Sequence, residues 1–146
     1  MTQTPPPVLI GAAAAYGLTL RRWRRVRRVW HLETNRGCFA LKPAPPPAEA
    51  DFLRRAEEHL AAQGFTRFPR LVRTAAGAPV CLLPSGERLV LRTWLPGSNP
   101  VLDLEHPRDL RRLAEAVAEM HLASLGFGGG ICPDRDFPSW PTVLAA

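Results

Sequence analysis

Apolar and polar residues alternate from about residue 20 to residue 43, where tryptophan, valine and leucine are separated by arginines. Alternation with a period of two is typical of strands that bury one face. Asn35 and Gly37 stand between two such runs and favour a hairpin turn. Pro43 and the prolines after it end the series, because proline cannot donate a ladder hydrogen bond. The pattern predicts three consecutive antiparallel strands at 21–26, 29–34 and 38–43.

Three other stretches have the three- and four-residue spacing of apolar positions that is typical of helices. A short alanine-rich helix is predicted over 8–16 and should end at Gly17, and a longer one over 48–63 should end at Gly64. A third is predicted over 106–125. The apolar positions expected to face a core are Phe52, Leu53, Ala56 and Leu60 in the second helix, and Leu110, Leu113, Val117, Met120 and Leu125 in the third.

Two further strands are predicted at 78–83 and 88–94, joined by a turn over 84–87, and residues 65–72 form a loop that becomes extended. Proline and glycine between 96 and 100 then break the chain as a linker would. The fold class is therefore α+β, with five antiparallel strands and one main helix. The segments are a tail with a short helix (1–17), a mixed region (18–95), a linker (96–105) and a helical region that has only begun (106–146).

The composition, with 46% hydrophobic and 22% charged residues over 146 positions, is typical of a soluble globular protein. No apolar run approaches the roughly 20 residues that a membrane span needs, and the N-terminus shows no secretion signal. The three cysteines are widely spaced and lack paired histidines, which argues against a disulfide framework and a zinc site. We expect a cytoplasmic protein without a membrane partner.

Lys42 is the only lysine among 19 basic residues; the other positive charges are all arginine. Lysine is a compact point charge on a flexible stem, whereas arginine presents a planar fork. A confined site that binds phosphate groups would therefore require lysine rather than arginine. The alternative interpretation is that a single lysine survived by chance in an arginine-rich chain.

The net charge of +6 is concentrated in six arginines between Arg21 and Arg28, interleaved with Trp23. Basic and aromatic residues together can grip a nucleic-acid backbone and stack on bases. On an alternating strand, the same series would place arginines on a solvated face and Trp23 with valine on the other. We favour the solvated face, so a nucleic-acid partner is not expected.

The ordered set of short phrases resembles a known family. The phrases are Tyr16-Gly17-Leu18, Leu32-Glu33-Thr34, Ala40-Leu41-Lys42, Gly64-Phe65, Thr93-Trp94-Leu95-Pro96-Gly97, Met120-His121-Leu122-Ala123-Ser124 and Ser139-Trp140-Pro141. They resemble the N-terminal portion of protein-kinase-like phosphotransferases, in the aminoglycoside/choline-kinase-like branch, and specifically the CotS-like spore-coat kinases. The resemblance implies a protein-kinase-like N-terminal lobe over 18–95, a hinge over 96–105 and the start of a helical C-terminal lobe.

The resemblance also implies site residues. Lys42 would contact the α- and β-phosphates of ATP, and Glu49 or Glu57 of the following helix would orient it. Both glutamates lie on one helical face, so the choice between them stays open; each could also be a solvated helix charge. Backbone groups of Thr93, Trp94 and Leu95 would hold adenine at the hinge. ATP and Mg are the implied cofactors.

Two departures from the family pattern limit this expectation. The first two strands are not joined by G-x-G-x-x-G, since Arg24 to Arg28 lie there, and residues 1–146 contain neither H-x-D-x-x-x-x-N nor the later metal-binding aspartate phrase. Asp134 and Asp136 are interpreted as a surface turn, and His121 as a packed helix histidine. We expect no kinase activity from this chain alone.

Three functions remain open at this point. The first is the nucleotide-binding half of a kinase that needs a missing C-lobe polypeptide. The second is a non-catalytic spore-coat scaffold with coat proteins as partners. The third is an arginine-rich nucleic-acid module.

Overall fold

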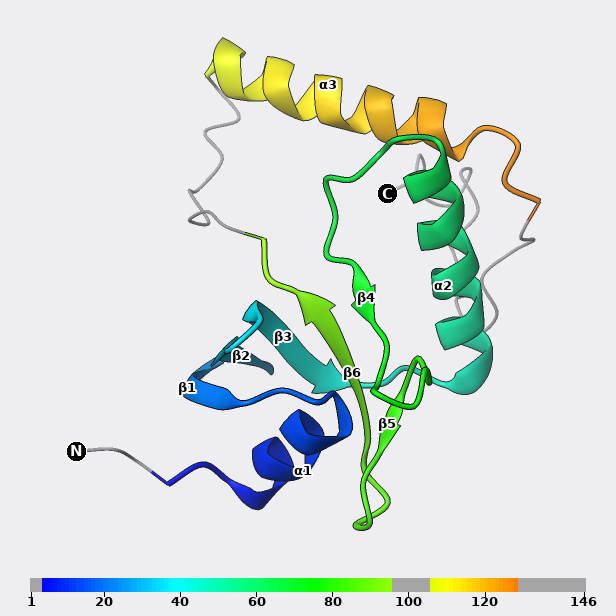
Figure 1. Cartoon of the computed structure of the whole chain (residues 1–146). Coiled ribbons are helices and arrows are strands. Elements are labelled where there is room, and N and C mark those ends of the chain that lie inside the picture. Colours follow the sequence, from blue (N-terminus) through cyan, green and yellow to red (C-terminus); the bar gives the residue numbers. More distant parts are fainter. Residues whose placement is uncertain (1–3, 96–105, 129–146) are drawn as a thin grey trace, which may run out of the picture.

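The computed structural model describes residues 4–95 and 106–128, which form one antiparallel sheet with three helices around it (Figure 1). The sheet order is β1-β2-β3-β6-β4, and β5 pairs with β6 off this path. The strands are β1 (Leu20–Val26), β2 (Val29–Thr34), β3 (Gly37–Pro43), β4 (Leu71–Val72), β5 (Cys81–Leu82) and β6 (Arg88–Thr93). The mixed α+β class and the antiparallel sheet are thus as predicted.

The sheet has six strands rather than five, because the extended end of the 65–72 segment pairs with β6 as β4. The strand predicted over 78–83 is reduced to Cys81–Leu82. Its first residues belong instead to a turn, in which Thr74 N–H donates to Ala78 O and Ala78 N–H to Thr74 Oγ1. Pro79 has no N–H to give to a ladder, so pairing begins only beyond it.

The helices are α1 (Pro7–Ala15), α2 (Pro47–Ala62) and α3 (Pro107–Ser124), within one residue of the predicted bounds. Each starts with a proline at its first position, where the missing N–H costs nothing. Gly17 and Gly64 adopt φ of 61° and 83° after α1 and α2. These left-handed conformations suit glycine and confirm both residues as helix stops.

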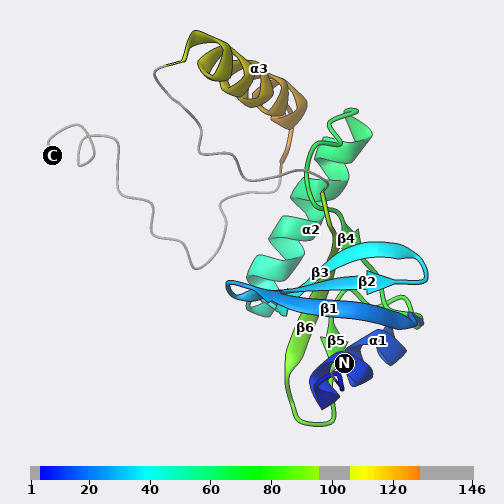
Figure 2. The ribbon, with the colours of Figure 1, turned by 90° about the vertical axis from the view of Figure 1, so that its left-hand side faces the viewer.

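The core lies between α1 and one face of the sheet, whereas α2 covers the other face (Figures 1 and 2). Apolar residues of the strands alternate toward α1, in agreement with the period-two pattern. The largest fully buried side chains of this core are Leu9, Leu32, Leu41 and Leu91. This core fixes which residues of β3 and β6 are left to face α2.

Tyr16, at the end of α1, joins this core to the sheet through its hydroxyl. The hydroxyl accepts the N–H of Leu91 at 3.2 Å and donates to Leu89 O at 3.4 Å. Burial is the main cause that raises the pKa of Tyr16 to about 12. Its neutral, hydrogen-bonded form is therefore favoured by the folded state.

Tyr16→Phe should lower the free energy of unfolding by about 1–3 kcal/mol, because the buried Leu91 N–H loses its acceptor. In the wild type, the unfolded tyrosine ionises near pH 10 and the folded one near pH 12. Stability should therefore fall between these two values as pH rises. Urea denaturation at pH 8, 10 and 11.5 checks both points. The phenylalanine variant should lose less stability over this interval than the wild type; an equal loss in both would contradict the role of Tyr16.

The apolar stripe predicted along α3 exists but is not buried. Leu110, Leu113, Val117, Met120 and Leu125 are 38–69% exposed. The end of α3 touches α2, where Phe127 packs edge-on against Phe52 at a centroid distance of 5.7 Å. His121 is exposed, so the prediction of a packed histidine is wrong. In the described ranges no helix has the length and apolarity to cross a membrane.

Candidate functional site

Lys42 and Arg92 lie on the same face of the sheet, the face that α2 covers. In the register of β3 and β6, Ala40 is opposite Arg92 and Lys42 is opposite Val90. Opposite residues share a face, and residues two apart on one strand share it as well. Lys42 and Arg92 are therefore diagonal neighbours, a spacing that long side chains can bridge.

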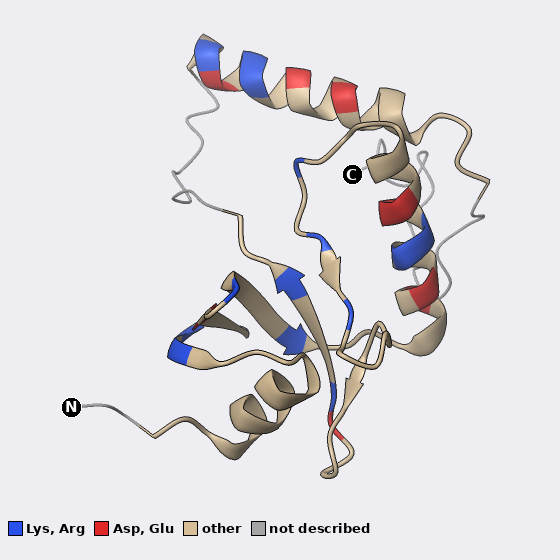
Figure 3. Cartoon of the chain, in the orientation of Figure 1, with Lys and Arg blue, Asp and Glu red and all other residues tan. Residues whose placement is uncertain are grey.

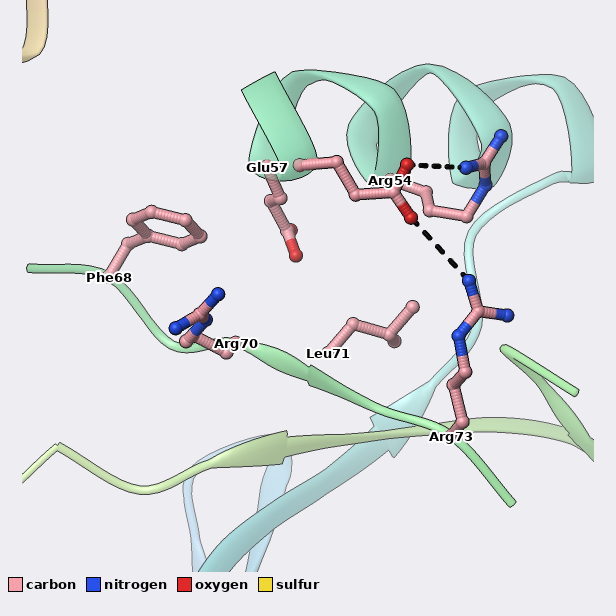
Figure 4. A pocket seen from close by; sticks show the side chains of 7 residues that line it. Arg54, Glu57, Phe68, Arg70, Leu71 and Arg73 are labelled. Atoms are coloured by element: carbon pink, nitrogen blue, oxygen red, sulfur yellow. Dashed lines mark hydrogen bonds and ion pairs between the residues drawn. The ribbon is translucent and has the colours of Figure 1, made fainter. Parts of the chain in front are cut away.

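Glu57 reaches this face from α2 and forms an ion pair with Arg92. The same guanidinium nitrogen of Arg92 also donates to Pro69 O at 3.0 Å. The two side chains are only 15% and 16% exposed, unlike the other ion pairs of α2. Figure 4 shows Glu57 pointing from the helix toward the sheet, while Arg54 and Arg73 converge on the adjacent carboxylate, that of Glu58.

The ammonium of Lys42 is half-buried and is surrounded by more than one charge. Burial is the main cause that lowers its pKa, and the Arg92 guanidinium lowers it further. Glu57 and Glu49 oppose this effect and favour the charged form. Both glutamates predicted to orient Lys42 thus act on it, but within the described residues the ion pair of Glu57 is made with Arg92 and not with Lys42.

Of the residues predicted to hold adenine at the hinge, Thr93 ends β6, and Trp94 and Leu95 directly follow it. Thr93 exchanges hydrogen bonds with Arg70, and Trp94 N–H donates to Cys38 O at 3.0 Å. The Trp94 ring meets that of His31 edge-on, with centroids 4.4 Å apart, and Leu95 is exposed. The rest of the predicted linker, 96–105, lies outside the described residues, as do Asp134 and Asp136.

His31 lies on β2 in the same transverse row as Ala40 and Arg92, so it belongs to the α2-facing side. It is 5% exposed, and its Nδ1 accepts a long hydrogen bond of 3.5 Å from Arg24. Burial lowers the pKa of His31, and Arg24 lowers it further, while Glu33 opposes them. A neutral imidazole therefore separates Trp94 from the arginines of β1.

The turn of the arginine-rich hairpin is too short to contain a glycine-rich, phosphate-covering loop. Val26 pairs with Val29, so that only Arg27 and Arg28 make the turn, with Arg27 at φ 54°. Arginines occur on both faces of β1, which corrects the expectation of one arginine face: Arg25 lies over the Trp30 ring, with 4.6 Å from its guanidinium carbon to the centroid. Figure 3 shows this basic hairpin well separated from the acidic residues of α2 and α3.

The family model of the phosphotransferase enzyme family matches residues 17–142, most of the chain. The chain belongs to this family. The match includes both the strand that carries Lys42 and the segment after it that supplies Glu57. It therefore covers the whole face described above.

Among solved structures, the chain is similar to an aminoglycoside phosphotransferase from Alicyclobacillus acidocaldarius, with a TM-score of 0.74 and 20% identity. The match covers 99% of this chain and 42% of that one, so the chain spans less than half the length of this relative. Among curated proteins, none matches. The structural likeness supports the predicted fold of a kinase-like N-terminal lobe.

Arg92, like His31, belongs to this face but was not predicted from the sequence. In the segment Leu89-Val90-Leu91-Arg92-Thr93, Arg92 lies on the same face of the strand as Val90, and the buried leucines lie on the opposite face. An arginine inside an otherwise apolar central strand requires a partner. That signal pointed to a carboxylate opposite β6, although it could not identify which one.

Proposed function

We propose that this chain is the nucleotide-binding N-terminal lobe of an ATP-dependent phosphotransferase of the CotS type. The observation that carries the proposal is the placement of Lys42: a half-buried ammonium at the end of β3, under the influence of Glu49 and Glu57 of the next helix. Lys42 would contact the α- and β-phosphates, and backbone groups near Thr93 to Leu95 would hold the base.

The donor set on the α2-facing side fits a phosphate group. Lys42 and Arg92 supply two positive charges, and Arg92 is held by the Glu57 carboxylate and by Pro69 O. Arg92 Nε is, within the described part of the chain, a buried nitrogen without a hydrogen-bond partner. Phosphate oxygens would accept hydrogen bonds from the Lys42 ammonium, and ATP would bring the negative charge that the two cations can balance.

Magnesium would neutralise the phosphates during transfer. The described residues include no cluster of three histidine, cysteine or acidic side chains that could hold a metal ion. In the proposal, the Mg ligands and the aspartate that positions the acceptor hydroxyl come from a C-terminal lobe. The chain by itself would then bind nucleotide weakly and transfer no phosphate.

Partner and location follow from the same proposal. A polypeptide that carries the C-terminal lobe would cover the exposed stripe of α3, because an apolar stripe of this size favours association. We place the protein in the cytoplasm, with association to a spore coat as the CotS-like resemblance implies. A coat scaffold without catalysis would use the same stripe to bind coat proteins.

Titration with Mg-ATP, followed by NMR or tryptophan fluorescence, tests the proposal. We expect binding of the chain with Kd on the order of 1 mM, and tighter binding after addition of a polypeptide that carries the C-terminal lobe. AMP and adenosine should bind more weakly than ATP, since they lack the β- and γ-phosphates. Absence of ATP binding under both conditions would contradict the proposed function.

A further inference from the structure

Arg92 is placed where it can compete with Lys42 for the carboxylate of α2. Both cations project from the sheet toward α2, and they are diagonal neighbours across β3 and β6. Glu57 pairs with Arg92, which is bound a second time by Pro69 O before β4. One guanidinium therefore connects α2, β6 and the segment that leads into β4.

This ion pair differs from the others on α2. Arg54 pairs with Asp51 and Glu58 at 2.7 Å each, but these carboxylates are 54% exposed. Exposed pairs of this kind contribute little, whereas removal of one member of a buried pair leaves an uncompensated charge. The Arg92–Glu57 pair is thus the α2 contact best able to set both the helix position and the charge near Lys42.

We propose that Arg92 is a positioning residue that takes Glu57 for itself, fixes α2 against the sheet and leaves the Lys42 ammonium for phosphate oxygens. The second half of this statement depends on the proposed function, and the first half does not. In this arrangement Glu57 and Glu49 both act on Lys42 through their charge, although the ion pair of Glu57 is made with Arg92.

The charges that face Lys42 determine what its titration reports. They are Arg92 from β6 and the two carboxylates of α2, Glu57 and Glu49. Arg92 disfavours the charged form of Lys42 and Glu57 favours it. Removal of Arg92 should therefore raise the pKa of Lys42, and removal of Glu57 should lower it. If Arg92 and Glu57 only held the helix in place, removal of either would loosen α2 and hydrate Lys42. The two substitutions would then shift the pKa of Lys42 in the same direction.

The single lysine of the chain allows a direct measurement. Reductive methylation with ¹³C-formaldehyde labels Lys42 and the α-amino group, whose signals differ, and the ¹³C chemical shift against pH gives the pKa of Lys42. Arg92→Met, Glu57→Gln and the double variant are compared with wild type. Arg55→Met, whose side chain lies on the exposed side of the same helix and pairs with Asp51, is the matched control.

We expect Arg92→Met to raise the pKa of Lys42 and Glu57→Gln to lower it, each by about one pH unit, with near cancellation in the double variant and no change in Arg55→Met. Shifts of the same sign in both single variants, or none, would overturn the inference. Arg92→Gln, which keeps some hydrogen bonding, replaces Arg92→Met if the latter fails to fold by circular dichroism, and the same upward shift is then required.

The result is separable from that of the nucleotide titration. Opposite pKa shifts together with no ATP binding would support the role of Arg92 and contradict the proposed function. ATP binding without opposite shifts would support the proposed function and contradict the role of Arg92.

Discussion

Replacement of Lys42 by methionine is expected to raise the Kd for Mg-ATP by roughly tenfold to a hundredfold. Methionine keeps an unbranched side chain and removes the ammonium, so the packing of the stem is preserved while the charged hydrogen bonds to phosphate are lost. Hydrogen bonds to charged groups contribute about 1.5–3 kcal/mol, which corresponds to this range of affinity. NMR titration of both proteins measures the change.

The Lys42→Arg variant should bind Mg-ATP almost as weakly as the methionine variant. The site is half-buried and already holds the guanidinium of Arg92 close by, and a second planar fork cannot replace a compact ammonium in that space. Adenosine, which has no phosphate, is the control ligand and should bind all three proteins equally. Full ATP affinity in the methionine variant would show that Lys42 is not a phosphate ligand.

Leu91→Ala is expected to have the largest effect on stability. Leu91 is fully buried on β6, opposite Leu41, which is fully buried as well, and its N–H bonds the Tyr16 hydroxyl. Removal of three side-chain carbons at such a position leaves a cavity and typically lowers the free energy of unfolding by about 2–5 kcal/mol. Urea denaturation followed by far-ultraviolet circular dichroism measures the loss.

Leu82→Ala is the matched control for this substitution. Leu82 lies on β5 of the same sheet but is 70% exposed, so its truncation should change the free energy of unfolding by less than about 0.5 kcal/mol. A similar loss in the two variants would mean that the core is not centred between α1 and β6, and would contradict the assigned register.

Much of the fold could be predicted because its signals are local. Period-two alternation, a turn that contains Asn35 and Gly37, and proline stops indicated β1 to β3, and Gly17 and Gly64 marked the ends of α1 and α2. β4 is only two residues long and exists because Leu71 and Val72 pair with β6. No local pattern marks so short a strand. The exposed stripe of α3 likewise depends on what packs against it, and periodicity does not report that.

The site was predicted less completely than the fold. Lys42 was identified from its singular residue type and its place at the end of the third strand, and the helix spacing indicated that Glu49 and Glu57 share a face. Which cation receives Glu57 depends on the register of β3 against β6 and on the distance to α2. Those are tertiary features, since Glu57 and Arg92 are 35 positions apart.

Protection of Lys42 by nucleotide is the most direct test of the central claim. Lys42 is the only lysine, so its acetylation by an amine reagent can be followed by peptide mass spectrometry, with the α-amino group as internal reference. The account predicts that Mg-ATP at about ten times its Kd slows modification of Lys42 roughly tenfold, while adenosine at the same saturation gives little protection. An unchanged rate at Lys42 with ATP bound would contradict the placement of the phosphates on this face.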